Sequence, residues 1–234
     1  MIFDITYLIL ICISIYLIAT LILKYRNSLI SIFLIYSFEA IAFLAAIRLL
    51  FAFDEWKMID ISETTLMICW HLLFYLSIGI FLMATRALLN VVDVKTQSFS
   101  LVKTFLITFL FSSGILLVFL SFTFIDKNIS PIMEGSLIDK WGLLHFVAFI
   151  FALVASIDLF KIKNKYKGTI GSISGPLIVT LVILSLIHFW ELLVESWMIV
   201  KVSLEFGESI EGILWIPVFV TIAYGYFRLK KALA

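Results

Sequence analysis

Seven runs of apolar residues, each long enough to cross a bilayer as one helix, dominate the sequence. A helical span of the hydrocarbon core takes about 20 residues. Because a bilayer offers no water to unpaired backbone groups, such runs fold as helices. We therefore expect an all-α, seven-transmembrane-helix bundle that forms a single transmembrane domain over residues 1–234. The predicted spans lie near residues 5–23, 29–53, 65–89, 101–125, 141–160, 176–200 and 213–229.

The composition supports a multi-pass protein of the lipid bilayer. Hydrophobic residues make up 63% of the chain and charged residues 14%, whereas soluble domains are roughly half apolar and about a quarter charged. The formal net charge is +1, and no basic stripe stands out from the loops. Nucleic acid is therefore not expected as a partner. We expect an integral protein of the cell membrane.

The distribution of lysine and arginine predicts how the chain is oriented, because basic residues gather on the cytoplasmic side of a membrane. If the N-terminus lies outside, twelve of the 17 basic residues fall on the inner side and four on the outer side, with Arg48 inside a span. The reverse orientation would place most basic residues outside. The bias predicts an outer N-terminus and a cytoplasmic C-terminus.

Two triplets of spans show weak similarity to each other. Aligning Trp70 with Trp215 also aligns Phe74 with Phe219, and Glu39 lies near Glu191 when the second and sixth spans are compared. One interpretation is a parallel repeat of three helices on either side of the fourth span, an arrangement known from transporters. The other is coincidence between apolar helices that all end in basic residues.

The sixth span contains the segment HFWELLVESW, in which three ionisable residues interrupt an apolar run. An ionisable residue at membrane depth costs roughly 2.5–3.5 kcal/mol, so it points to a functional site. His188, Glu191 and Glu195 fall within about 60° of one another on a helical wheel. Trp190 and Trp197 fall on the opposite face. We expect the three polar side chains to face the interior of the bundle.

Other spans carry groups that would complete a site. His71 and His145 lie near the outer starts of their spans, and Glu39 lies near the middle of the second. If these faces converge, imidazole and carboxylate groups would suit a transition-metal ion such as zinc, copper, iron or manganese. The candidate metal ligands are His188, Glu191, Glu195, His71 and His145, and the candidate polar cavity is lined by Glu39, Glu191 and Glu195. A proton-linked cavity and a purely structural hydrogen-bond network are the alternatives.

Sequence motifs for other chemistry do not occur. The chain has no nucleophile elbow and no glycine-rich phosphate loop, so an enzyme is not favoured. The last span carries lysine only at its inner end, at Lys230 and Lys231, which disfavours a retinal Schiff base. We predict a transport-type or ion-binding protein with an outward-facing His/Glu cavity. The alternative is a non-transporting subunit or receptor that acts through a partner membrane protein or a second copy of the chain.

Overall fold

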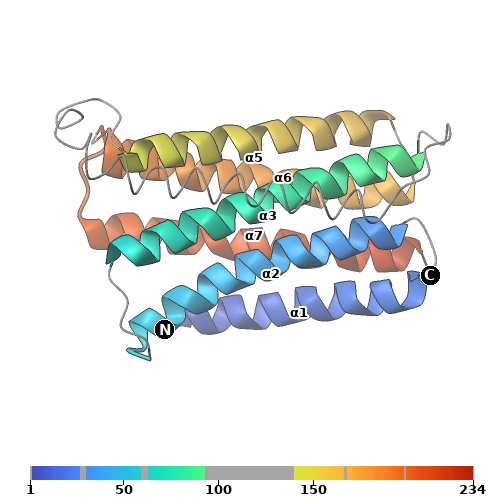
Figure 1. The fold of residues 1–234 in the computed structure, drawn as a ribbon, viewed down its shortest axis with the longest axis horizontal. Coiled ribbons are helices and arrows are strands. Elements are labelled where there is room, and N and C mark those ends of the chain that lie inside the picture. Colours follow the sequence, from blue (N-terminus) through green and yellow to red (C-terminus); the bar gives the residue numbers. More distant parts are fainter. Residues whose placement is uncertain are drawn as a thin grey trace. The chain divides into compact units, whose positions relative to one another are not determined.

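The computed structural model describes residues 2–26, 30–58, 63–92, 140–165, 168–197 and 199–233. Every regular element within these ranges is helical, as predicted (Figure 1). The predicted span at residues 101–125 lies outside the described residues. The elements are α1 (Ile2–Tyr25), α2 (Ile30–Glu55), α3 (Glu63–Val92), α5 (Lys140–Lys165), α6 (Thr169–Glu191), the π-helical turn η1 (Leu192–Ser196) and α7 (Leu204–Ala232).

Five of these helices contain stretches long and apolar enough to cross a membrane, namely α1, α2, α5, α6 and α7. Among the described side chains of α3, an apolar stretch covers Cys69–Phe81. Five such helices are the pattern of a multi-pass membrane protein. The count of seven spans and the outer N-terminus stay predictions.

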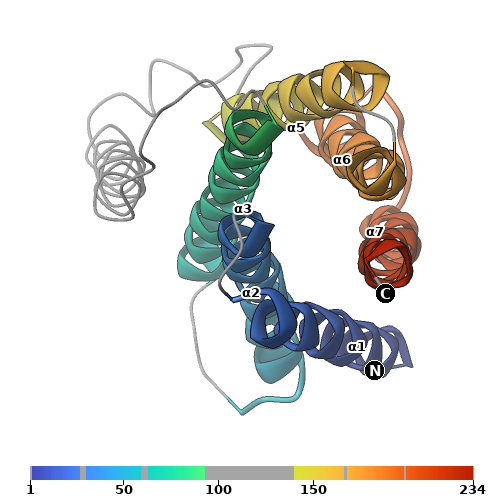
Figure 2. The same cartoon turned by 90° about the vertical axis from the view of Figure 1, so that its right-hand side faces the viewer.

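The chain divides into two compact units, and both are built from helices packed side by side. One unit comprises Met1–Leu17 and Pro131–Ala234, and in it α6 packs against both α5 and α7 (Figure 2). The other unit comprises Ile18–Ser130, and in it α2 packs against α3. Short connections join α5 to α6 and α6 to α7, so α6 is antiparallel to both of these helices. That the whole chain forms one domain stays a prediction.

The contact between α5 and α6 runs along a stripe of small residues. Ala148, Ala152 and Ala155 recur every three or four residues on α5, and all are fully buried. Small side chains let two helices approach closely in a membrane. Val154 and Ile157 on the other face of α5 are exposed, as expected for side chains that contact lipid.

A second close approach holds α6 against α7. A Cβ atom built on Gly225 of α7 would lie 3.2 Å from Cβ of Pro176 of α6. One turn further along α6, the hydroxyl groups of Thr180 and Thr221 lie 2.8 Å apart. The glycine therefore sets the spacing at which the two hydroxyls meet.

The first half of α1 runs parallel to α7. The hydroxyl of Tyr7 donates a hydrogen bond to the carbonyl of Gly212, and the Tyr7 ring lies 6.2 Å from the ring of Phe219. Nine residues later, the ring of Tyr16 lies 5.9 Å from Nζ of Lys230. Both helices therefore advance in the same direction, which is the arrangement expected for the first and last of seven spans.

We predict that Gly225→Ala lowers the unfolding temperature of the detergent-solubilised protein. The new methyl group would press on the rigid ring of Pro176, and such overpacking costs about 1–3 kcal/mol. Above the low end of that range, the cost exceeds the roughly 1 kcal/mol that alanine gains over glycine inside a helix. Thermal unfolding followed by tryptophan fluorescence measures the effect.

Gly207→Ala is the matched control, because the added Cβ would meet only Cγ1 of Val194 at an ordinary 3.5 Å. This variant should unfold at the wild-type temperature or above. Equal unfolding temperatures for the two variants would show that Gly225 does not set the spacing of α6 and α7.

Candidate metal centre

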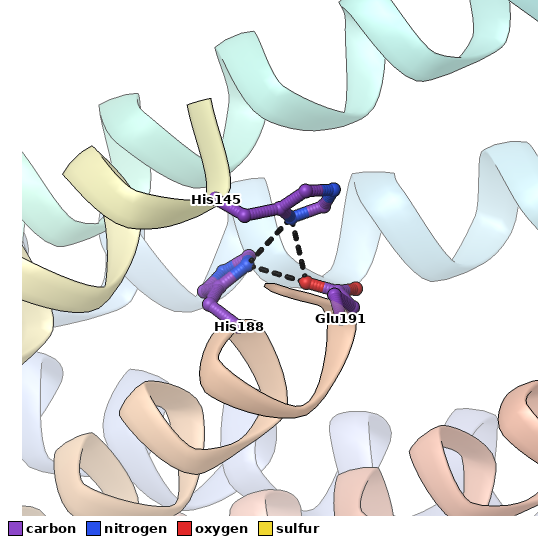
Figure 3. Close-up of side chains that lie close together, drawn as sticks. All are labelled: His145, His188 and Glu191. Atoms are coloured by element: carbon purple, nitrogen blue, oxygen red, sulfur yellow. Dashed lines mark hydrogen bonds and ion pairs between the residues drawn. The ribbon is translucent and has the colours of Figure 1, made fainter. Parts of the chain in front are cut away.

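Three buried side chains from two neighbouring helices point toward a common centre (Figure 3). α5 contributes His145, and α6 contributes His188 and Glu191 at its C-terminal end. The two histidines are fully buried and Glu191 is 4% exposed. Each residue offers one ligand atom, and all three atoms lie within 4.8 Å of one another.

The donor atoms form a small triangle. Oε2 of Glu191 lies 2.7 Å from Nδ1 of His188 and 2.8 Å from Nδ1 of His145. The two Nδ1 atoms are 3.3 Å apart. One carboxylate oxygen therefore contacts both imidazoles at once, and the two imidazoles also contact each other.

The local geometry of each helix explains why these groups meet. His188 and Glu191 are three residues apart, which places them on one face of α6, as predicted from the sequence. His145 continues the stripe that contains Ala148 and Ala152 on α5. Since α5 and α6 are antiparallel, the start of one helix lies level with the end of the other. The alanines bring the backbones close enough for His145 to reach across.

The α-helical part of α6 ends at Glu191, where the turn widens. In η1 the amide of Trp197 donates to the carbonyl of Leu192, five residues earlier. The regular helix therefore stops before residue 200, where the sequence placed the end of the span. π-Helical turns within helices occur frequently at functional sites.

This early end places the triad of His145, His188 and Glu191 near one end of both helices. Glu191 is the last residue of the α-helical part of α6, and His145 is the sixth residue of α5.

Trp190 lies on the face of α6 opposite the polar stripe, as predicted. Its indole N–H donates to the carbonyl of Gly207 at the start of α7, with an N···O distance of 3.3 Å. This face of α6 therefore contacts a neighbouring helix at the level of Trp190. Trp197 packs edge-on against Phe189, with 6.4 Å between ring centroids.

The remaining predicted site residues are not part of the triad. Glu195 belongs to η1, but its side chain lies outside the described part of the structure. His71 is buried in α3, edge-on to Trp70 with ring centroids 4.3 Å apart. Glu39 is half-buried in α2. His71 and Glu39 belong to the other compact unit, and their approach to the triad stays a prediction.

Two kinds of chemical state are compatible with the triangle. Without an ion, either both imidazoles donate an Nδ1 proton to Oε2 of Glu191, which leaves two donors facing each other at 3.3 Å, or a proton on Oε2 is donated to one Nδ1 while the other Nδ1 donates to Oε2. With an ion, all three atoms direct lone pairs at the metal, and no donor faces another donor. In this metal-bound state, all three short contacts join atoms that are ligands of the same ion.

Comparisons with known proteins do not identify the chain: no protein-family model, curated protein or solved structure gives a significant match.

Proposed function

We propose that this protein binds a divalent transition-metal ion inside the membrane, between α5 and α6. The observation that carries the proposal is the triad of His145, His188 and Glu191, whose donor atoms lie within 4.8 Å of one another. Imidazole nitrogen and carboxylate oxygen are ligands of zinc, iron, manganese and copper(II). Soft thiolate or thioether groups, which favour copper(I), are not among the three donors.

The energetics of burial support an ion at this position. An ionised carboxylate in apolar surroundings is costly unless an opposite charge or hydrogen bonds compensate it. Two neutral imidazoles and one carboxylate carry a net charge of −1, which a divalent cation outweighs. The ion would hold the carboxylate in its charged form between α5 and α6.

A proton site is the second candidate, and the two shortest contacts favour it. The distances of 2.7 and 2.8 Å between Glu191 and the two histidines match charge-assisted hydrogen bonds. In this state an imidazolium neutralises Glu191, and the triad stores one proton. A protein of this kind would couple transport or signalling to pH without a metal.

We predict that purified protein contains zinc, copper, iron or manganese at close to one ion per chain. His145→Ala, His188→Ala and Glu191→Ala each remove a donor atom, so each should lose the ion. Changes to residues beyond the ligands typically weaken a site about 10–100-fold, and loss of a ligand should weaken it at least as much. Elemental analysis of purified, chelator-washed protein measures the content.

His71→Ala is the matched control, since it removes another fully buried histidine that is not one of the three donors of the triad. It should retain the metal. Wild-type protein that folds without any metal, and in which Glu191→Gln abolishes a pH-dependent activity, would instead support the proton site.

The packing of α5 against α6 gives a prediction that leaves all three donors intact. Ala148→Leu adds volume one turn from His145 at a fully buried position. It should push the helices apart and weaken metal binding about 10–100-fold, as other positioning changes do. The measurement is titration of metal-depleted protein with Zn²⁺ in the presence of a competing chelator.

Val154→Leu also enlarges a side chain on α5, but at a position that is 45% exposed. It should bind Zn²⁺ like the wild type. Equal weakening in both variants would mean that bulk on α5, rather than the spacing of the helices, disturbs the site.

We extend the proposal to transport of the bound ion. The triad lies near one end of both α5 and α6, and the bias in basic residues predicts that this end faces outward. An ion held there would exchange with the outer solution in one state of a transport cycle. The competing interpretation is a subunit that uses the ion to hold a partner protein.

Reconstituted vesicles distinguish these two roles. We expect vesicles that contain the protein to take up Zn²⁺ or Mn²⁺, detected by a chelating dye inside them, and Glu191→Ala to abolish the uptake. A stoichiometric partner that copurifies with metal-loaded protein, together with no uptake, would favour the subunit.

A further inference from the structure

The size of the donor triangle carries information about the coordination number of the ion. For ions 2.0–2.2 Å from their ligands, donors at 90° are separated by about 2.8–3.1 Å and donors at the tetrahedral angle by about 3.3–3.6 Å. The three separations here are 2.7, 2.8 and 3.3 Å. The two contacts of Glu191, at 2.7 and 2.8 Å, lie at the short end of the right-angle range, and the 3.3 Å between the two imidazoles lies at the tetrahedral value.

We infer that the ion is six-coordinate, with Nδ1 of His145, Nδ1 of His188 and Oε2 of Glu191 on one face and three positions open to exogenous ligands. This inference rests on the proposed metal binding and specifies what the site does with the ion. Three mutually perpendicular protein donors occupy half of an octahedron. The opposite half then takes water or small molecules that bind through oxygen or nitrogen.

The position of the ion follows from the same triangle. A point about 2.1 Å from each of the three donors lies about 1.2 Å out of the plane that contains them. The ion would therefore sit above the triangle rather than within it. Its remaining ligands would approach from the side opposite the protein donors.

The types of the three donor atoms also favour metals that accept six ligands. Two histidines and one carboxylate on one face, with open positions, are typical of iron(II) sites that bind small molecules. A structural zinc site is closed by four protein ligands, and a catalytic zinc site leaves one position open. Iron(II), manganese(II) and cobalt(II) accept six ligands readily, so we assign the site to this class.

Metal substitution in the wild-type protein tests the inference. Metal-depleted protein in detergent is loaded with cobalt(II), and its visible spectrum is recorded before and after addition of azide. Six-coordinate cobalt(II) gives weak absorption bands, whereas four-coordinate cobalt(II) gives intense ones. We expect weak bands that shift when azide replaces water at an open position, and no bound cobalt in His188→Ala.

A second measurement uses iron(II) under anaerobic conditions with nitric oxide as the probe. An open position binds nitric oxide and gives a half-integer-spin adduct with a characteristic electron paramagnetic resonance signal. We expect one adduct per bound iron, and the same signal in His71→Ala and Glu195→Ala, because the inferred site takes its three protein donors from His145, His188 and Glu191.

The outcomes separate this inference from the proposed metal binding. Intense cobalt bands that azide does not shift, or bound iron that gives no nitric oxide adduct, would overturn the open six-coordinate site and leave metal binding intact. Loss of the adduct in Glu195→Ala or His71→Ala would reveal a fourth protein ligand and overturn the three-donor face. Failure to bind either metal would overturn the proposed function itself.

Discussion

The close approach of α5 and α6 is the constraint on which the candidate site depends. Three fully buried alanines on α5 remove the side-chain bulk that would otherwise separate the two backbones. In a bilayer, lipid chains are as apolar as the side chains they replace, so helices associate mainly through close packing and polar contacts. The alanine stripe provides the packing, and the triad at its end provides the polar contact. The two effects act on the same pair of helices.

The sequence predicted well those features that depend on one helix. The lengths of the apolar runs were sufficient to predict α1, α2, α5, α6 and α7, because the thickness of the bilayer sets the length of a span. The common face of His188 and Glu191 follows from helical periodicity alone. The end of α6 could not be predicted in this way, because residues 192–200 remain apolar enough to continue a span while the backbone changes to a π turn.

The choice of His145 over His71 as the partner of His188 required knowledge of which helices pack together. Both histidines lie near the start of a predicted span, and both are fully buried. Depth alone therefore could not separate them. A usable signal was present in the alanines that follow His145 on the same face, since a stripe of small residues marks the side of α5 that another helix approaches. The short connection from α5 to α6 indicates that the approaching helix is α6.

The contacts within each unit also limit the proposed repeat. Ser77 of α3 donates to the carbonyl of Ala40 of α2, and Thr221 of α7 meets Thr180 of α6. If Trp70 corresponds to Trp215, then Ser77 corresponds to the residue after Thr221, and Ala40 lies at the level of Thr180.

Under this alignment, the position in α6 equivalent to Glu39 lies about three helical turns from Glu191. The alignment of Trp70 with Trp215 is therefore incompatible with the alignment of Glu39 with Glu191. The triad uses residues of α5 and α6, and under the tryptophan alignment it has no counterpart at Glu39. Whatever the origin of the two helix triplets, the three residues of the triad belong to the C-terminal one. A site built on one triplet needs only the packing of its own helices to hold the three donors in place.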